Sequence, residues 1–419
     1  MIRPMGLLAI VGLQLLLAGL YLGFMPDRPP EGVLTINLLG GFAFVSMSVS
    51  MILSTRLPFL EDAFGGLDRV YQVHKYSGIL AVLAVVAHFL LQPDNLASMV
   101  QGGEDALRPS GPVGTYAMVF LLLGTMIALN RKVRYSRWHP THKVMAVVYV
   151  LATVHIVTMP GAFLDLNTPA GYFIVVLGSL GLLSGIYALF VMNRLTALSF
   201  TVEKVSRLER TTELVLKPDR QMPAFRPGQF VFVELRGKGW SEPHPFTIAS
   251  APQEDRLRLA VKALGDWTRK LREELEPGGK AIVRGPYGRF DTLRSGAKQV
   301  WVAGGIGVTP FLSNLRAMRA RDLREVHLFY AVRSLRDALY LDEISRRAEE
   351  LPNLTLTVLN SETGQRASLE TIAAALPCPV AEFAFFMCGP DGMTASLRKQ
   401  LGLRGVRRRN IHLEAFEFR

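Results

Sequence analysis

Four histidines in two apolar segments are the residues whose types and spacing best suit metal chemistry in this sequence. Each segment is long enough to cross a bilayer, which takes about 20 residues of helix. Two such helices running in the same direction would present one pair of imidazoles at one depth and a second pair about 20 Å further along. This geometry suits two stacked haems, each ligated by one histidine from each helix. The segments are residues 72–92, with His74 and His88, and residues 141–159, with His142 and His155.

The same histidines could instead serve only in packing. Ionisable side chains are rare and costly inside membrane helices, however, and are therefore functional candidates. Their spacing of fourteen residues places His88 within about 40° of the helix face that carries His74. The spacing of thirteen leaves His155 about 140° from His142. We therefore expect the second helix to wind tightly, or His142 to lie at an irregular start close after Pro140.

The composition favours a membrane domain followed by a water-soluble one. Of the 419 residues, 49% are hydrophobic, and the apolar excess lies in the first half of the chain. We attribute the net charge of +12 to Lys and Arg at the cytoplasmic side of a membrane rather than to nucleic-acid binding. The basic run RGVRRRN is interpreted in the same way, as a solvated or membrane-facing surface. The two cysteines, Cys378 and Cys388, provide neither a disulfide framework nor a cysteine-based metal site.

Six apolar runs predict six transmembrane helices, the first of them a retained helix rather than a cleaved signal peptide. The second and fourth connections are rich in Lys and Arg, whereas the odd-numbered connections carry only Arg28 and Arg108. The positive-inside rule then places both termini in the cytoplasm and makes the third and fifth helices parallel. The runs are 5–24, 33–54, 72–92, 113–130, 141–160 and 170–192, and the inner charges are Arg56, Arg69, Lys75, Arg131, Lys132, Arg134, Arg137 and Lys143.

This topology pairs His74 with His142 at the inner level and His88 with His155 at the outer level. His139 falls in the basic inner loop, so we interpret it as a surface residue or a neighbour of a haem propionate rather than a ligand. The loop 131–143 is expected to face the domain that supplies electrons, and reversing its charge should then slow electron transfer to the haem.

The second half of the chain changes character twice. From about residue 198, short runs alternate apolar and polar residues between turn residues, which predicts an antiparallel β-barrel. From about residue 298, strands alternate with helices, which predicts a parallel α/β sheet of the Rossmann-like, dinucleotide-binding kind. The predicted fold is therefore a multi-domain membrane protein with a helical bundle at 1–195, a barrel at 196–296 and an α/β domain at 297–419.

Two motifs in this half could bind cofactors. In VAGGIGVTPF, residues 302–311, glycines between a strand and a helix allow close approach of a phosphate to a helix N-terminus, although the motif could be a plain tight turn. In HPFTIAS, residues 244–250, an aromatic ring and hydroxyls could hold a flavin, with the Thr247 hydroxyl near the flavin N5, although ordinary barrel sequence could look the same.

A third stretch, FYAVRSLRD, could select the nucleotide. Arg333, Ser334 and Arg336 could meet a 2′-phosphate, because a guanidinium fork suits phosphate oxygens. No acidic residue ends the strand to favour NADH, so the sequence favours NADPH, with a solvated basic turn as the alternative.

The order of several motifs carries a family resemblance. PGQF (227–230), HPFT (244–247), VKALGDWT (261–268), GPYG (285–288), GGIGVTP (304–310) and CGP (388–390) together resemble dehydrogenases of the ferredoxin–NADP reductase type. GDWT and HPFT point more narrowly to the NADPH oxidases and their ferric reductase relatives, and the chain looks most like a compact prokaryotic-type NADPH oxidase. Members of that family have the same six-helix, two-haem domain with histidine spacings of fourteen and thirteen.

The resemblance implies a role for individual residues. Cys388 would lie near the nicotinamide, or would simply be a small buried residue. Phe416, with Phe418 as second choice, would stack on the flavin, or would be part of an edge-strand core. FAD would be bound by His244, Pro245, Phe246, Thr247, Val261, Lys262, Gly265, Asp266, Trp267 and Thr268, and the nicotinamide nucleotide by Gly304, Gly305, Gly307, Thr309, Pro310, Arg333, Ser334, Cys388, Gly389 and Pro390.

The function implied is transfer of electrons from cytoplasmic NADPH through FAD and two b-type haems to O₂ outside the inner (plasma) membrane, which gives superoxide. In the oxidases, a His and an Arg usually lie over the outer haem, but here the corresponding positions offer Gln92 and Asn37. Ferric-chelate reduction with the same electron path therefore stays open, as does delivery of electrons to a periplasmic or membrane partner. The expected surroundings are a lipid bilayer, with no nucleic acid and no obligatory regulatory subunit.

Overall fold

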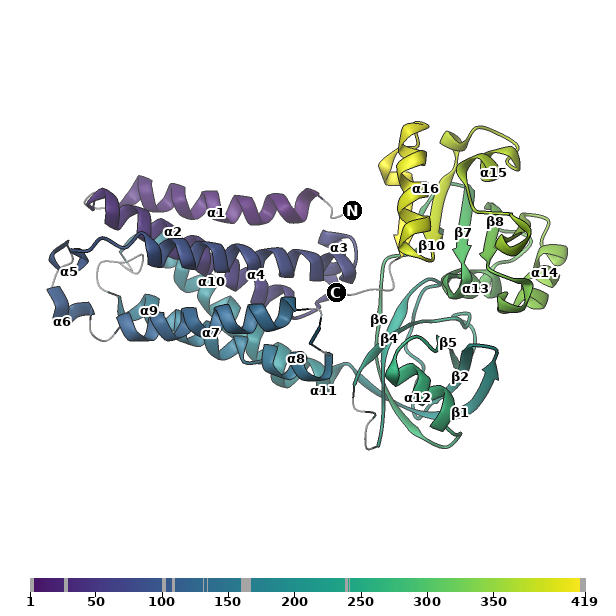
Figure 1. The fold of residues 1–419 in the computed structure, drawn as a ribbon, viewed down its shortest axis with the longest axis horizontal. Helices are drawn as coiled ribbons and strands as arrows, with labels where there is room; N and C mark the ends of the chain where they lie inside the picture. The colour runs from purple at the N-terminus through teal and green to yellow at the C-terminus, as the bar shows by residue number, and fades with distance from the viewer. Residues whose placement is uncertain are drawn as a thin grey trace. The chain divides into compact units, whose positions relative to one another are not determined.

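The computed structural model describes the chain except residues 1–3, 26–28, 100–102, 108–109, 131, 134, 160–166, 238–239, 241 and 415–419. The chain forms two compact units, Met1–Leu195 and Thr196–Arg419 (Figure 1). Each unit is described by itself below.

In its described residues, the first unit consists of helices, five of which are long and apolar enough to span a membrane. They correspond to five of the six predicted runs, and the first run corresponds to α1 (Pro4–Phe24), whose apolar stretch Leu8–Phe24 is shorter. The long helices are α2 (Glu31–Leu53), α4 (Leu67–Leu90), α7 (Gly111–Leu129), α8 (Tyr135–His142) continued by α9 (Met145–Thr158), and α10 (Pro169–Ile186) continued by the π-helix η1 (Tyr187–Val191) and α11 (Met192–Leu195). Short helices are α3 (Pro58–Phe64), α5 (Leu96–Met99) and α6 (Gly103–Leu107).

The surface of this helical unit is apolar, as contact with lipid requires. α2 packs along α4 and is lined with buried residues such as Phe44 and Val45. Large apolar side chains point outward from the helices around it, which in water would be an unfavourable exposed patch. Examples are Leu15, Leu83, Tyr116, Val147 and Leu183. The unit is therefore a multi-pass membrane domain.

The junction between α8 and α9 accounts for the angular mismatch between His142 and His155. α8 contains Pro140 and ends at His142, and the chain then turns through residues 143–144 before α9 begins. Four backbone bonds here join residues three apart, which is tighter winding than an α-helix provides. Both anticipated irregularities are thus present: tight winding and a histidine placed before the regular helix. The bonds run from the amides of Lys143, Val144, Ala146 and Val147 to the carbonyls of Pro140, Thr141, Lys143 and Val144, at 2.9–3.2 Å.

As far as the structure describes it, the second unit begins with a six-stranded antiparallel sheet in the order β4-β3-β6-β1-β2-β5. A bridge between Ile248 and Leu259 joins the segment after β4 to β5. The two edges of the sheet therefore approach each other, and the sheet curves into a half-barrel. This agrees with the predicted barrel. Its strands are β1 (Ala197–Leu208), β2 (Thr211–Pro218), β3 (Phe230–Leu235), β4 (His244–Thr247), β5 (Leu257–Lys262) and β6 (Lys280–Tyr287), and α12 (Asp266–Glu274) follows β5.

Between residues 297 and 414, the rest of this unit is a parallel five-stranded sheet in the order β11-β10-β7-β8-β9. Strand order reverses between β7 and β10, which creates a topological switch point at their carboxyl ends. The strands are β7 (Lys298–Gly304), β8 (Glu325–Val332), β9 (Leu354–Asn360), β10 (Ala384–Cys388) and β11 (Ile411–Glu414). The helices are α13 (Thr309–Ala317), α14 (Leu341–Glu350), α15 (Leu369–Ala374) and α16 (Asp391–Leu403), with 3₁₀ turns η2 (Thr292–Arg294), η3 (Gly305–Val308), η4 (Leu335–Asp337), η5 (Ser361–Thr363), η6 (Val380–Glu382) and η7 (Arg408–Asn410).

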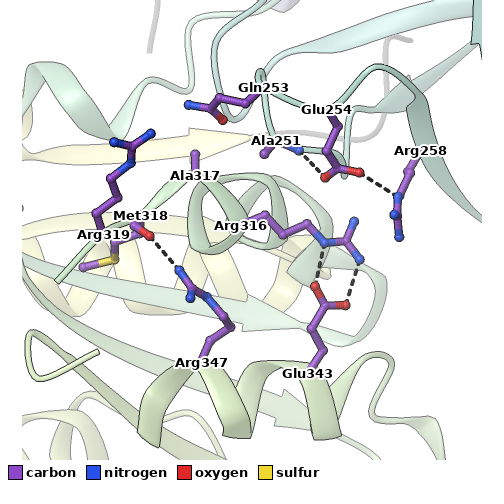
Figure 2. Close-up of a pocket in the computed structure, with 10 residues that line it drawn as sticks. All are labelled: Ala251, Gln253, Glu254, Arg258, Arg316, Ala317, Met318, Arg319, Glu343 and Arg347. Atoms are coloured by element: carbon purple, nitrogen blue, oxygen red, sulfur yellow. Dashed lines mark hydrogen bonds and ion pairs between the residues drawn. The ribbon is translucent and has the colours of Figure 1, made fainter. Parts of the chain in front are cut away.

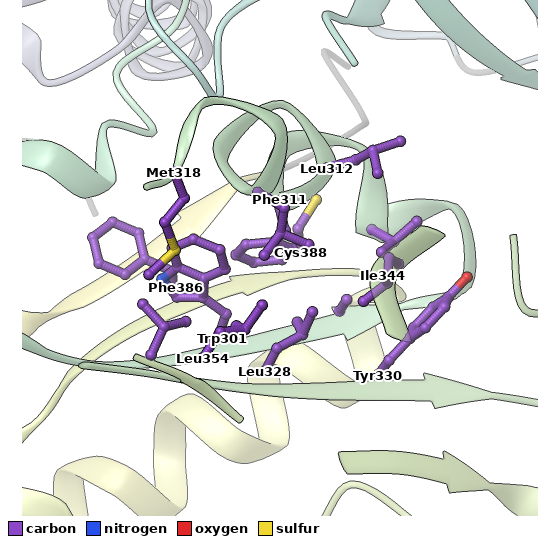
Figure 3. Packing of buried hydrophobic residues seen from close by; sticks show 14 of the residues in the cluster. Trp301, Phe311, Leu312, Met318, Leu328, Tyr330, Ile344, Leu354, Phe386 and Cys388 are labelled. Carbon is purple, nitrogen blue, oxygen red and sulfur yellow. The ribbon is translucent and has the colours of Figure 1, made fainter. Parts of the chain in front are cut away.

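Both faces of the parallel sheet are covered, as the continuous apolar strands require. Along β10, Phe386 and Cys388 join one buried cluster, whereas Phe385 and Met387 join the cluster on the opposite face. Figure 3 shows the first cluster, in which Trp301 of β7 packs beside Phe311 of α13 with ring centroids 5.4 Å apart. This packing fixes α13 against the sheet, and with it the turn that precedes the helix.

Candidate functional site

The four predicted histidines form two pairs, each with one member on α4 and one from the α8–α9 segment. The ring centroids of His74 and His142 are 5.8 Å apart, and those of His88 and His155 are 6.4 Å apart. Two imidazoles on opposite sides of one metal, with metal–nitrogen bonds of about 2.0 Å, have centroids roughly 6 Å apart. Both pairs therefore have room for one iron between two axial imidazoles.

Backbone carbonyls orient three of the four rings. A carbonyl can only accept, so each ring donates from Nδ1 and leaves the Nε2 lone pair available to a metal. The fourth ring, that of His142, has no hydrogen-bond partner at Nδ1 among the described residues and packs edge-on against Trp138, with centroids 5.7 Å apart. The three bonds run from His74 to Ser50 O (3.0 Å), from His88 to Ile36 O (2.7 Å) and from His155 to Ser110 O (2.9 Å).

Glycines on neighbouring helices make room for the outer pair. A Cβ atom on Gly114 would lie 2.6 Å from the His155 ring, and one on Gly40 would lie 3.2 Å from Nδ1 of His88. Sequence reasoning did not identify these glycines or the carbonyl acceptors, because neither has a local signature. Within the described residues, no group of three or more His, Cys, Asp or Glu side chains could hold a metal ion. A pair of histidines suits a haem, whose porphyrin would supply the remaining ligands of the iron.

The residues predicted to bind flavin gather around β4 and the start of α12. The His244 ring lies 4.2 Å from that of Trp267, centroid to centroid, and the Phe246 ring lies 5.9 Å from it. Nε1 of Trp267 is buried and has no hydrogen-bond partner among the described residues. Thr247 is buried and pairs with Phe230 of β3. The arrangement provides aromatic faces and an unused donor, which fit a flavin nucleotide.

Other predicted flavin residues lie at the end of β5, on β4 or at the start of α12. Thr268 accepts at Oγ1 from the amides of Leu264 and Gly265, which shapes the turn before α12. Val261 and Lys262 end β5, where they pair with Thr212 and Thr211 of β2. Asp266 forms an ion pair with Arg269, and Pro245 pairs with Phe232 of β3.

His244 makes the stability of this region pH-dependent. Burial lowers the pKa of its imidazole from the ordinary value of 6.5, and the carboxylate of Glu242, 3.4 Å away, opposes this effect. The unfolded chain therefore binds the proton more tightly, so the free energy of unfolding should fall as the pH drops below about 6.5. We expect His244→Gln to lose stability less steeply than the unchanged protein over that range. Melting temperatures of the two proteins measured along a pH series test this, and parallel curves would contradict it.

The Gly-rich turn and the CGP turn meet at the switch point between β7 and β10. Cα of Gly304 and Cα of Gly389 approach so closely that a Cβ on Gly389 would lie 2.9 Å from Gly304 Cα. A Cβ on Gly307 would lie 2.2 Å from the carbonyl oxygen of Cys388. Thr309 and Pro310 then open α13, and Thr309 Oγ1 donates to Ile306 O. Open α/β sheets bind ligands at such a crevice, with phosphate at the helix N-terminus.

The remaining predicted nucleotide residues differ in how accessible they are. The Cys388 side chain is fully buried in the cluster of Figure 3, and burial raises the pKa of its thiol well above the ordinary value. Ser334 donates from Oγ to Asp337 within its own turn, at 3.1 Å. Arg333 is exposed at the end of β8. Phe416 and Phe418 lie outside the described residues.

Family models match three consecutive parts of the chain. Residues 39–153 match the ferric reductase like transmembrane component, residues 197–293 an FAD-binding domain and residues 301–399 the oxidoreductase NAD-binding domain. The first match includes His74, His88 and His142 and ends two residues before His155. The other two cover the half-barrel and the parallel sheet.

Two dual oxidases match most of this chain in sequence. Dual oxidase 2 of Sus scrofa is 29% identical over 77% of this chain, and Dual oxidase 2 of Rattus norvegicus is 25% identical over 79%. The chain spans only 24% of the length of each. The flavohemoprotein of Deinococcus radiodurans is 27% identical over 46% of this chain and 52% of its own. A crystal structure of flavohemoglobin from Malassezia yamatoensis with bound FAD and heme has a TM-score of 0.53 and 21% identity, covering 91% of this chain and 97% of that one, which bears on the fold alone.

Proposed function

Because the chain belongs to the NADPH oxidase and ferric reductase family, we propose that it is a transmembrane NAD(P)H oxidase that uses FAD and two b-type haems to produce superoxide. When bound, NADPH supplies a hydride, FAD accepts it and the haems carry single electrons onward to O₂. The dual oxidases match about three quarters of this chain but extend far beyond it, so the proposed activity rests on the residues of this chain.

One observation carries the proposal: two imidazole pairs lie at two levels between α4 and the α8–α9 segment. An FAD- and NAD-binding unit follows them in the same chain. His74 and His142 would hold the inner haem, and His88 and His155 the outer one. Since imidazoles would fill both axial positions, each haem would suit electron transfer better than direct ligation of O₂. Oxygen would react at the edge of the outer haem.

In the second unit, β4 and the start of α12 would hold FAD, and the turns at the switch point would hold the nucleotide. Aromatic rings of Phe246 and Trp267 would contact the flavin, and Thr247 would offer its hydroxyl near N5. Gly304, Gly305 and Gly307 would admit the nucleotide phosphates to the N-terminus of α13. We propose Phe416 as the aromatic residue that stacks on the flavin. Because the Cys388 thiol is buried and protonated, its proposed place near the nicotinamide is a matter of shape rather than of thiolate chemistry.

The charge pattern supports an orientation with both termini and the cofactor-binding unit in the cytoplasm. Lys and Arg residues cluster in the connections after α2 and α7, whereas the opposite connections are poor in them. We propose the plasma membrane as the location. NADPH would then be oxidised inside and the acceptor reduced outside.

The test is an anaerobic spectrum of the purified protein with FAD and NADPH, followed by air. Bis-histidine b-type haem bands that appear on adding NADPH support the internal path. Fast reoxidation, with cytochrome c reduction that superoxide dismutase suppresses, supports the oxidase. A protein with no haem bands contradicts the proposal.

Ferric-chelate reduction is the second candidate, and a contact at the outer end of α2 favours it. Asn37 takes the place where the oxidases usually have an Arg, and its Nδ2 donates to Tyr21 Oη at 2.9 Å. This position therefore offers no cation that would stabilise the superoxide anion as it forms. Slow reoxidation in air combined with fast reoxidation by a ferric chelate would select this function over the oxidase.

Arg333 should determine the preference for NADPH. Its exposed guanidinium follows β8, where it can meet a 2′-phosphate. We expect Arg333→Ala to raise the KM for NADPH about tenfold, the loss of a charged hydrogen bond worth roughly 1.5 kcal/mol. The KM for NADH, which lacks this phosphate, should not change and is the internal control. Equal effects on both nucleotides would show that Arg333 does not read the phosphate.

A further inference from the structure

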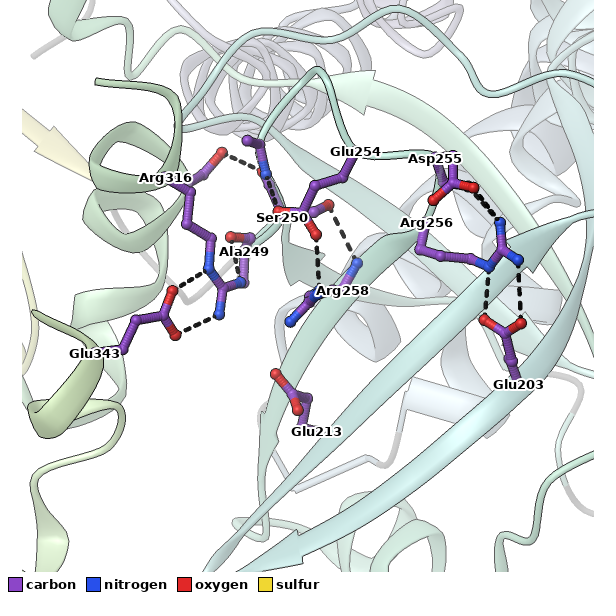
Figure 4. A network of polar contacts seen from close by, with 12 residues as sticks. Glu203, Glu213, Ala249, Ser250, Glu254, Asp255, Arg256, Arg258, Arg316 and Glu343 are labelled. Atoms are coloured by element: carbon purple, nitrogen blue, oxygen red, sulfur yellow. Dashed lines mark hydrogen bonds and ion pairs between the residues drawn. The ribbon is translucent and has the colours of Figure 1, made fainter. Parts of the chain in front are cut away.

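Helix α13 connects the Gly-rich turn to the half-barrel directly. It begins at the turn, and four to seven residues later two of its side chains reach carbonyls of the barrel. Ser313 donates from Oγ to Ser250 O at 2.7 Å, and both residues are fully buried. Arg316 donates from Nη1 to Ala249 O at 2.9 Å (Figure 4). One short helix therefore carries both the proposed phosphate site and these two contacts.

The two acceptor carbonyls lie immediately after the strand proposed to hold the flavin. β4 ends at Thr247, and the next three residues are bonded firmly into the barrel. Ala249 donates its amide to Arg258 O at 2.8 Å, and Ser250 accepts at Oγ from the Arg258 amide at 3.2 Å. The Ala249 side chain also packs in the core of the parallel sheet. A shift of α13 would therefore be a shift relative to β4.

The guanidinium of Arg316 is held on its other side as well. Its side chain is only 9% exposed, and it forms a two-pronged ion pair with Glu343 of α14, at 2.6 and 2.8 Å. Figure 2 shows this pair at one wall of a pocket of about 470 Å³. The planar guanidinium fork matches a carboxylate in this way, which fixes the orientation of the donor that reaches Ala249.

Tyr340 adds a second connection beside the first. The centroid of the Tyr340 ring lies 5.5 Å from the Arg316 guanidinium, and the Tyr340 hydroxyl donates to Glu213 of β2 at 2.9 Å. Its backbone has a φ of +59°, an unfavourable conformation for a residue with a large side chain. Such a conformation persists only where surrounding contacts hold it. The position of this corner against the barrel is therefore specified by several contacts at once.

We propose that Arg316 is a positioning residue that sets the separation between the bound nucleotide and the flavin. The inference rests on the proposed function, in which the C4–H bond of the dihydronicotinamide breaks and its hydride, with both electrons, forms the N5–H bond of the flavin. The nucleotide is thereby oxidised and the flavin reduced by two electrons. A misplacement of about 1 Å can slow such a transfer about 100-fold. Arg316 would therefore affect the rate through the separation of nucleotide and flavin, without contacting either of them.

The test is rapid-mixing reduction of bound FAD by NADPH under anaerobic conditions, in the full chain. In Arg316→Leu the limiting rate per bound flavin should fall at least about tenfold. The dissociation constant for NADPH should stay within about twofold, because the Gly-rich turn itself is unchanged. Arg316→Lys keeps the charge but loses the fork and should recover part of the rate. A purely structural role would lower FAD content or the melting temperature and leave the rate per bound flavin unchanged.

Arg347→Leu is the matched control. Arg347 lines the same pocket and donates to the carbonyls of Leu315 and Met318, but its bonds stay within the parallel-sheet part of the unit. This variant should lose stability and keep the hydride-transfer rate. Equal rates in Arg316→Leu and Arg347→Leu would overturn the proposal. If Arg316→Leu does not fold, Ser313→Ala, which removes the neighbouring bond, decides in the same way.

A measurement without cofactors gives an independent reading. Amide hydrogen exchange of residues 248–259 should speed up in Arg316→Leu and not in Arg347→Leu, and no difference between them would count against the proposal. The outcome is separable from the proposed function. Flavin that NADPH reduces while the haems stay oxidised would reject the oxidase and leave this inference standing. Flavin that neither NADPH nor NADH reduces would reject both.

Discussion

Replacing His88 with leucine is expected to lower the haem content of the protein from two per chain to one. The change removes one imidazole of the outer pair, and the partner ring of His155, 6.4 Å away, cannot hold an iron axially on both sides. The remaining inner haem should still be reduced by NADPH. Loss of a residue that only hydrogen-bonds to a metal ligand costs roughly 10- to 100-fold in activity. Because His88 would itself be a ligand, reduction of an external acceptor should fall by more than this.

The inner pair should give the opposite pattern. His142→Leu should also leave one haem per chain, but NADPH should no longer reduce it, because the step between flavin and outer haem is missing. Haem is measured by extraction and by the reduced-minus-oxidised spectrum. Reduction of the remaining haem in His142→Leu, and none in His88→Leu, would reverse the proposed order of the two sites.

His139→Leu is the matched control for both variants. His139 lies in the same short helix as His142, and its ring packs against Trp138, with centroids 6.1 Å apart, rather than against a histidine of α4. We expect this variant to keep two haems per chain. Loss of a haem here would mean that the ligand of the inner site has been assigned to the wrong histidine.

Replacing Gly307 with alanine is the second change with a large expected effect. The added Cβ would lie 2.2 Å from the carbonyl oxygen of Cys388 and 2.9 Å from the amide nitrogen of Gly389. Both are backbone atoms, so no side chain can move aside to relieve the contact. The Gly-rich turn and the end of β10 must then separate, which should cost about 1–3 kcal/mol of stability. The phosphate site at the switch point opens at the same time, so NADPH affinity should fall about tenfold or more.

Gly392→Ala tests whether the effect depends on that contact. Gly392 lies in the first turn of α16, and a Cβ there would meet no atom within 4 Å. Alanine also suits a helix better than glycine does. We expect unchanged NADPH binding and an equal or slightly higher melting temperature. Calorimetric titration of the FAD-loaded proteins with NADPH measures both variants, and equal affinity in Gly307→Ala and Gly392→Ala would refute the role of the turn.

The sequence by itself was sufficient for features that depend on local pattern. Apolar runs predicted the long helices, because membrane spans have a fixed length and composition. Alternating apolar and polar residues predicted the strands of the half-barrel, because side chains in a strand repeat every two residues. Alternation of strands with helices predicted the parallel sheet. The fourteen- and thirteen-residue spacings, together with the parallel direction that the charge pattern predicted for the two helices, also predicted which histidines would face each other. Even the mismatch in angle pointed to the tight winding after Pro140, since a proline inside a helix disturbs the bonds around it.

Only the tertiary structure decided features that join residues far apart in the chain. The carbonyls that orient the rings of His74 and His88 lie 24 and 52 residues away, on α2. Any residue type provides such a carbonyl, so composition cannot reveal it. The burial of Cys388 depends on α13 packing over β10, and the contact of Arg316 with Ala249 spans 67 residues. Helix and strand periodicity fix which face a side chain occupies, whereas the partner it meets there depends on how separate elements pack.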